Sequence, residues 1–196
     1  MRLSLNLRTS VSISPALAVF VAVVALVAFA PSVAVSTERD APTSKLRIII
    51  LKKQRRLEVY SSDTLLRTYR IGLGLNPKRP KERQGDNATP EGSFYVCVKN
   101  ASSKYYRSLG LSYPGPADAE RGLRSGLVTN AQRTRILSAH RHRTTPPWNT
   151  RLGGEIFIHG RGSQSDWTWG CVALDDADMA ELFAMVPLGT EVVIRP

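Results

Sequence analysis

A histidine and a cysteine stand twelve positions apart in the run EIFIHGRGSQSDWTWGCVAL near the C-terminus of the chain. Three apolar residues, 156–158, come directly before His159, and the apolar stretch 172–174 follows Cys171. Short apolar runs of this kind, bounded by glycine, predict buried β-strands. The sequence therefore predicts a sheet in which an imidazole and a thiol meet at neighbouring strand ends.

This pair of side chains is typical of acyl transfer by a cysteine. A thiol attacks a carbonyl carbon as its thiolate, so it needs a nearby base to lower its free pKa of about 8.5. We predict Cys171 as the nucleophile, His159 as the proton acceptor and donor, and the carbonyl of Gly160 as the group that orients the imidazole. The amides near Trp169, Gly170 and Cys171 are expected to bind the oxyanion that develops during attack.

The first 34 residues are predicted to direct export. Arg2 and Arg8 precede an uncharged apolar core at Leu17–Ala30, which resembles a secretory signal peptide with cleavage after Ala34. The alternative is an uncleaved membrane anchor, since the apolar run approaches the lower length limit for a spanning helix. In either case the rest of the chain is expected outside the cytoplasm, with the periplasm as the compartment that we predict, and it touches a membrane only if the leader stays uncleaved.

The remaining chain is basic. Without the leader it has 25 basic and 16 acidic residues, a formal charge of +9. Such a charge attracts polyanions, and for an exported protein these are cell-wall polymers or lipid headgroups rather than nucleic acid. Residues 35–44 are expected to form a linker, and residues 45–196 a single domain.

Most of this domain is predicted to be β-structure. We expect strands at Lys45–Leu51, Arg56–Tyr60, Leu65–Ile71, Ser93–Val98 and Glu191–Ile194. Ala177–Val186 has apolar residues at helical spacing, and Asp175 and Asp176 are placed to cap a helix there. Long loops without regular structure are expected at Asn76–Pro90 and Thr129–Arg151. The fold class is thus mainly β, with one or two short helices.

Several motifs together resemble one known family. They are IGLGLNPKRPKERQGDNATPEGSFYV (71–96), SKYYRSLGLSYPGPADAERG (103–122), IFIHG (156–160), DWTWGCVAL (166–174) and VPLGTEVVIRP (186–196). The chain is similar to the L,D-transpeptidase catalytic domain, the YkuD family of exported peptidoglycan enzymes, over roughly residues 45–196. The resemblance implies a β-sandwich fold and a cysteine acyl-enzyme formed on tetrapeptide stems, with loss of the terminal D-alanine.

The spelling around the cysteine departs from the common family pattern. Where many members have Ser-His-Gly-Cys, an apolar residue and then arginine, this chain has TWGCVA (168–173). This spelling resembles the YafK-like branch, in which some relatives are hydrolases that release wall-bound protein. The reaction is therefore predicted as L,D-transpeptidation. The alternative is a related hydrolase, either an L,D-carboxypeptidase or an amidase that releases wall-linked lipoprotein. A non-catalytic wall-binding module is the second alternative, and an outer-membrane lipoprotein is a possible partner.

Four residues are assigned to substrate binding. Trp167 and Thr168 precede the nucleophile, and Lys81 and Arg83 lie in the loop that relatives place near the cleft, where they could bind stem carboxylates. The competing interpretations are a core position for the tryptophan and a solvated charged loop for the two cations.

The sequence predicts no metal site and no cofactor. His140 and His142 stand close together, but without carboxylates or cysteines at metal-ligand spacing a solvated basic loop is the expected structure. Cys97 and Cys171 could pair in an exported protein, whereas the strand around Cys97 favours a free, buried thiol.

Overall fold

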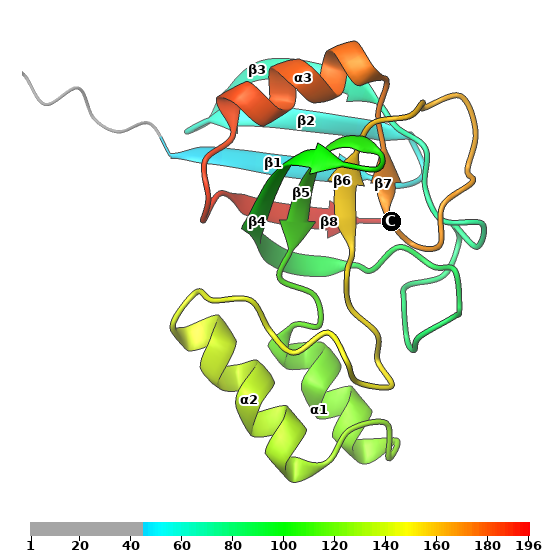
Figure 1. The fold of residues 1–196 in the computed structure, drawn as a ribbon, viewed down its shortest axis with the longest axis vertical. Helices are drawn as coiled ribbons and strands as arrows, with labels where there is room; N and C mark the ends of the chain where they lie inside the picture. The colour runs from blue at the N-terminus through cyan, green and yellow to red at the C-terminus, as the bar shows by residue number, and fades with distance from the viewer. Residues whose placement is uncertain (1–44) are drawn as a thin grey trace, which may run out of the picture. The chain divides into compact units, whose positions relative to one another are not determined.

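The computed structural model describes residues 45–196, so the predicted leader and the predicted linker both lie outside the described residues. An eight-stranded sheet in the order β3-β2-β1-β8-β4-β5-β6-β7 forms the body of the domain (Figure 1). The strands are β1 (Leu46–Leu51), β2 (Arg56–Ser61), β3 (Thr64–Arg70), β4 (Gly92–Ser103), β5 (Tyr106–Leu111), β6 (Phe157–His159), β7 (Val172–Ala173) and β8 (Glu191–Arg195). The predicted β-rich fold is confirmed.

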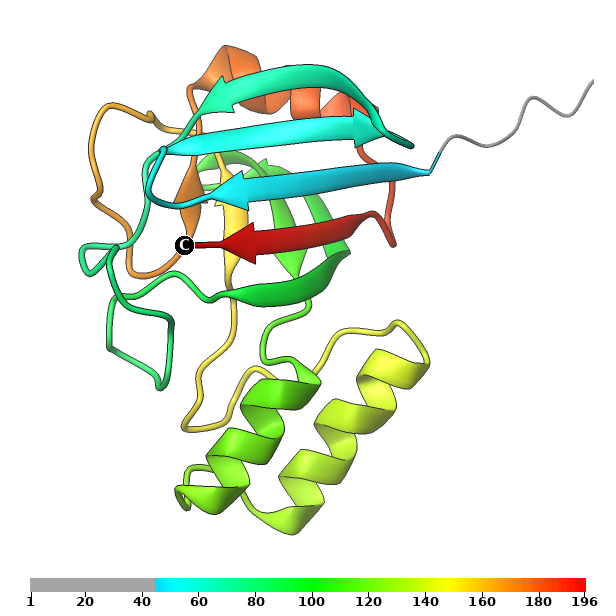
Figure 2. The ribbon, with the colours of Figure 1, turned by 180° about the vertical axis from the view of Figure 1, so that it is seen from behind.

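Strand β4 joins the two halves of the sheet. Its first residues pair with β8, and the residues from Val96 onward pair with β5. The register with β5 shifts between Val96 and Val98, which makes Cys97 the extra residue of a β-bulge. A bulge bends its strand and increases the local twist. The sheet accordingly curls at this strand (Figure 2). Strands of both halves contribute residues to one core cluster.

The core follows from alternation along the strands. Ile48 and Ile50 of β1 and Leu57 and Val59 of β2 all bury their side chains completely, because successive residues of a strand face opposite sides. Helix α3 (Asp176–Met185) adds residues such as Leu182 to the same cluster, as its apolar spacing predicts.

Two further helices correct the sequence-based expectation of one or two helices and of a loop over residues 129–151. Helix α1 (Pro116–Arg124) begins with proline in its first turn, and helix α2 (Asn130–Arg141) begins with a capping box between Thr129 and Gln132. They pack on one another through a small separate cluster that includes Ile136 and Leu152. Both lie together at one end of the domain, away from α3 (Figures 1 and 2).

The helical pair is tied to the loop between β3 and β4. The Arg121 guanidinium donates a hydrogen bond to the Lys81 carbonyl at 3.1 Å, and the Gln84 amide donates to the Arg151 carbonyl at 2.9 Å. This loop therefore has fixed partners despite its lack of regular structure. Among residues 45–196, no helix is long and apolar enough to cross a membrane.

Candidate active site

Strands β6 and β7 bring the predicted nucleophile and base together. They pair in parallel, with Ile158 opposite Val172 and His159 opposite Ala173. Cys171, the residue before β7, therefore falls opposite Phe157. Since side chains alternate along a strand, Cys171 and His159 belong to the same face of the sheet.

Both side chains line one cavity of about 740 Å³. The loop before β4, the β4–β5 hairpin and the segments on either side of β6 and β7 form its walls. The lining residues are Lys81, Gln84, Gly85, Asn87, Asn100, Ser103, Lys104, Tyr105, Ser108, Trp148, Gly153, Gly154, Glu155, Ile156, Phe157, His159, Trp167, Thr168, Trp169 and Cys171. A cavity of this size is typical of a small-molecule or peptide site.

His159 has the tautomer and the protonation state that a base requires. Its side chain is only 3% exposed, and its Nδ1 lies 2.7 Å from the Gly160 carbonyl oxygen. Because a carbonyl only accepts, Nδ1 carries the hydrogen and Nε2 keeps a free lone pair. Burial lowers the pKa of His159 below its ordinary value, and the bond to Gly160 offsets part of this shift. The imidazole is therefore neutral at pH 7.

Two aromatic rings hold the imidazole in place. The Tyr105 ring stacks on it with centroids 4.7 Å apart and an interplanar angle of 24°, and the Trp167 ring meets it edge-on at 5.6 Å. Trp167 is itself fixed, because its indole N–H donates to the Gly162 carbonyl at 3.1 Å. Sequence reasoning missed Tyr105. It comes from the turn between β4 and β5, and no local pattern indicates a contact with a histidine more than fifty positions away.

The thiol of Cys171 is half-buried and faces polar backbone groups. The Phe157 amide donates to its sulfur at 3.4 Å, and the thiol lies 3.6 Å from the Glu155 carbonyl oxygen. Burial raises the pKa of Cys171, while the Phe157 N–H and the charge of Lys81 act in the opposite direction. With burial as the largest influence, the thiol is protonated at rest, and a nucleophilic attack by Cys171 would require loss of this proton.

The turn before the cysteine is tightly fixed. The Gly170 amide donates to the Thr168 hydroxyl oxygen at 3.2 Å, and that hydroxyl donates to the Cys171 carbonyl at 2.8 Å. Gly170 has φ +125°, and a Cβ there would come within 2.7 Å of the Ala88 carbonyl oxygen, so only glycine fits. Of the three amides predicted to bind an oxyanion, that of Gly170 thus already has a partner within the turn. The Thr168 side chain, predicted to contact substrate, is buried and holds the turn together.

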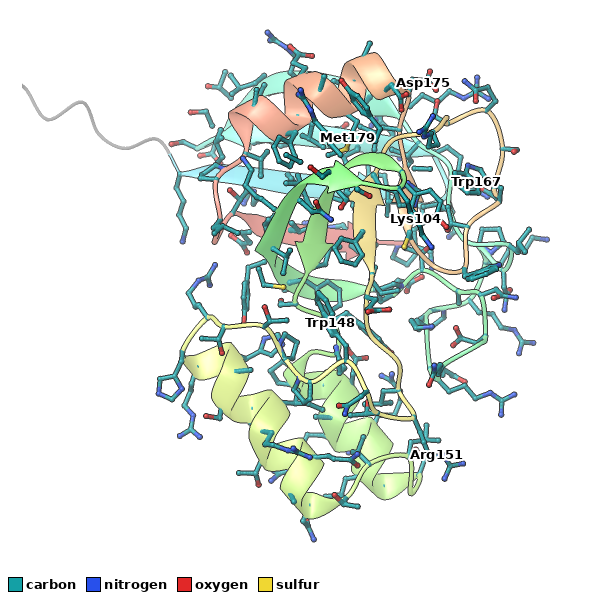
Figure 3. The ribbon with its side chains drawn as sticks, viewed as in Figure 1. Lys104, Trp148, Arg151, Trp167, Asp175 and Met179 are labelled. Carbon is teal, nitrogen blue, oxygen red and sulfur yellow. The ribbon has the colours of Figure 1, made fainter. Side chains whose placement is uncertain are left out.

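The two predicted substrate cations differ in position. Lys81 lines the cavity but is 4% exposed, and its ammonium donates to Asp86 Oδ1 at 2.9 Å and to the Arg83 carbonyl at 3.0 Å. Arg83 is exposed and is not among the lining residues. A third cation, Lys104, lines the cavity beside Tyr105, with its ammonium 5.0 Å from that ring's centroid (Figure 3). Sequence reasoning did not select Lys104.

Comparison with known proteins decides the family. Residues 45–194 match the L,D-transpeptidase catalytic domain, YkuD. The chain belongs to this family. The members of this L,D-transpeptidase family act on peptidoglycan, and the resemblance inferred from the sequence motifs is thereby confirmed.

One curated relative and one solved structure match parts of the chain. A protein of Escherichia coli K12 named "Putative L,D-transpeptidase YafK" is 34% identical over 86 residues, which cover 40% of this chain and 35% of that protein. The helical cell shape determining protein Pgp2 from Campylobacter jejuni has a similar fold, with a TM-score of 0.54, 22% identity and coverage of 77% of this chain and 47% of that one. The chain thus spans less than half the length of either relative.

Two positions near Cys171 differ from the common family sequence pattern, and the structure shows the side chain that this chain has at each. Trp169 stands where many L,D-transpeptidases have a second histidine, and its side chain is 78% exposed at the cavity. Ala173 stands where those members have an arginine, and it is fully buried in β7. Among the residues that line the cavity, the cations are Lys81 and Lys104.

The other sequence candidates lie away from the cavity. His140 and His142 occupy the end of α2 rather than a solvated loop, and His140 Nε2 lies 2.8 Å from the Ser112 carbonyl oxygen. Within residues 45–196 no group of three or more metal-ligating side chains gathers. Cys97 and Cys171 are both free thiols.

Proposed function

We propose that this domain is a cysteine acyltransferase that acts on the tetrapeptide stems of peptidoglycan. The observation that carries the proposal is the placement of His159 and Cys171 on one face of β6 and β7, in the wall of one cavity, within an L,D-transpeptidase-family chain. Export to the periplasm, through the leader outside the described residues, belongs to the same proposal.

In the first half-reaction, Cys171 Sγ attacks the carbonyl carbon of the third stem residue while His159 Nε2 takes the thiol proton. The neutral state of His159 supports this role, because a base must be unprotonated before it acts. The amides of Trp169 and Cys171 remain the candidate donors to the developing oxyanion. The C–N bond to D-alanine then breaks, the imidazolium returns its proton to the leaving amine, and a thioester forms on Cys171.

In the second half-reaction, the acceptor decides the outcome. An amine from another stem would displace the cysteine and form a cross-link, an amine of a lipoprotein would give a wall anchor, and water would release a tripeptide. Hydrolysis, including release of wall-linked lipoprotein, is the second candidate. The reason is that a buried alanine, Ala173, stands where the common family pattern has an arginine.

The test incubates the protein without its leader with purified disaccharide tetrapeptide and follows the muropeptides by mass spectrometry. Dimers that lack one D-alanine would establish transpeptidation, and tripeptide without dimer would establish hydrolysis. A second incubation with lipoprotein-linked peptidoglycan tests the amidase reaction.

Two cysteine variants make the test specific. Cys171→Ala should abolish every product, whereas Cys97→Ala, which removes the other thiol of the domain, should leave product formation intact. If the wild-type protein binds the wall polymer but gives no product in either incubation, the proposal fails and a non-catalytic wall-binding module becomes the better account.

A further inference from the structure

Two large exposed apolar residues lie on neighbouring backbone segments, Trp169 in the lining of the cavity and Leu75 on the segment beside it. Trp169 is 78% exposed and Leu75 is 57% exposed. Their backbones are neighbours, because the Leu75 amide donates to the Thr168 carbonyl at 2.9 Å next to a parallel bridge between Gly74 and Thr168. Exposed apolar residues on neighbouring segments next to a cavity are typical of a binding surface.

The backbone beneath these two side chains is rigid. The Thr168 amide donates to the Leu73 carbonyl at 3.1 Å, so Thr168 is bonded on both sides to the same neighbouring segment. Gly74 lies so close to the next segment that a Cβ would come within 2.2 Å of the Asn87 carbonyl oxygen and 3.1 Å of Gly170 Cα. Trp169 is thus exposed on a fixed turn rather than on a loose loop, which reduces the entropy lost when a ligand binds.

Side-chain amides complete the surface. Asn87 and Gln84 line the same cavity wall as Trp169, and Asn87 is fixed by the bond from the Asn76 amide to its carbonyl at 3.0 Å. A side-chain amide offers both donors and an acceptor. If an apolar protein surface or a lipid tail covered Trp169, it would bury the side-chain amides of Asn87 and Gln84 without hydrogen-bond partners, which costs free energy. The surface suits a ligand with one apolar face and a polar edge.

We infer that this surface binds an N-acetylated sugar ring of the glycan strand that carries the stem peptide. The ring's C–H face would stack on Trp169 and contact Leu75, and its hydroxyl and acetamido groups would bond with Asn87 and Gln84. This inference rests on the proposed function, since it assigns a binding site for the glycan next to the thiol that attacks the peptide. Trp169 then serves as a specificity-determining residue.

The test measures equilibrium binding in the Cys171→Ala background, so that no turnover occurs. Titration calorimetry compares disaccharide tetrapeptide, the same tetrapeptide without sugar, and the disaccharide alone. We expect the sugar to tighten binding about tenfold, which is the effect expected from one aromatic stacking contact that buries apolar surface. Trp169→Ala should reduce this ratio to about one, and Trp169→Phe should retain part of it. Leu188→Ala, an exposed leucine outside the cavity wall, is the matched control and should leave the ratio unchanged.

The arms separate failure of this inference from failure of the proposed function. Equal affinity for the two tetrapeptide ligands, or a sugar effect that survives Trp169→Ala, would overturn the sugar site and leave the acyltransferase proposal standing. Binding of the disaccharide alone, lost in Trp169→Ala, would support the sugar site even if the tetrapeptide did not bind, a result that would count against the acyltransferase.

Discussion

The two thiols of this domain lie in contrasting surroundings, one at the bulge of β4 and the other at the start of β7. Cys97 and Cys171 are both half-buried and free, and burial raises the pKa of each. Cys97 donates to the Gly110 carbonyl of the adjacent strand at 3.4 Å. Cys171 receives the Phe157 amide, shares its sheet face with His159 and borders the cavity. Burial disfavours the thiolate of both residues, so the reactivity proposed for Cys171 depends on its neighbours.

Removal of the proposed nucleophile is expected to cause the largest loss of activity, and removal of the other thiol almost none. Cys171→Ala should lower kcat by at least about 10⁴-fold, as loss of a nucleophile does in other acyl-transfer enzymes. Product formation from disaccharide tetrapeptide measures it. Cys97→Ala should retain nearly full activity, and a comparable loss in that variant would mean that the two thiols have been assigned the wrong roles.

Removal of the base should have the next largest effect. His159→Ala should lower kcat by about 10²- to 10⁴-fold, the usual contribution of general acid–base catalysis. The thiol itself stays in place, so single-turnover kinetics should show slow acylation rather than none. An acylation rate close to that of the unmodified protein would show that another group deprotonates Cys171.

Distortion of the turn before Cys171 should come third. Gly170→Ala places a Cβ against the Ala88 carbonyl at φ +125°, which should move the turn and lower kcat/KM by about 100-fold. Gly126→Ala is the matched control, because that glycine also has positive φ but has nothing within 4 Å of the added Cβ. If both variants lose activity equally, backbone strain in general, rather than the position of the thiol, explains the loss.

Loss of the stacking ring should have a smaller effect. Tyr105→Leu removes the ring that lies 4.7 Å from the imidazole and should lower kcat by about tenfold with little change in KM, since Tyr105 positions His159. Tyr105→Phe keeps the ring and should restore most of kcat. A loss in KM alone would instead place Tyr105 among the substrate contacts.

The smallest expected effect is a shift in the pH dependence of kcat/KM. His159 must be neutral to accept a proton, and burial lowers its pKa from the ordinary value of 6.5. Activity should therefore be present above the lowered pKa and fall as the pH drops through it, so kcat/KM should reach half its maximum below pH 6.5. If kcat/KM instead fell to half its maximum above about pH 7, His159 would not be neutral at rest beside a protonated Cys171.

The local pattern of the sequence was enough to predict much of the sheet. The alternation in residues 46–61 gives β1 and β2 nearly to the residue, and the helical spacing of Met179 and Leu182 gives α3. Helix α2 was missed because it buries only Ile136 and Ala139, which leaves too little apolar periodicity. Its capping box at Thr129 and Gln132 was the signal that could have revealed it.

The candidate site was predictable to a similar extent. The spacing and flanking strands of His159 and Cys171 placed both at neighbouring strand ends, and the contact expected with the Gly160 carbonyl is present. Tyr105 and Lys104 could not be predicted, since pairing of β5 with β6 brings their hairpin to the site. The assignments of Thr168 and Arg83 came from position in the chain, which does not reveal that Thr168 is engaged within the turn or that Arg83 lies outside the cavity wall.

The most direct test of the central claim is the intact mass of the protein after brief exposure to disaccharide tetrapeptide, with the adduct located by proteolysis. The account predicts a mass increase equal to the muropeptide minus D-alanine, on the peptide that contains Cys171, in the unmodified protein and in Cys97→Ala. It predicts no adduct in Cys171→Ala. An adduct on the Cys97 peptide, or consumption of tetrapeptide that persists in Cys171→Ala, would contradict it.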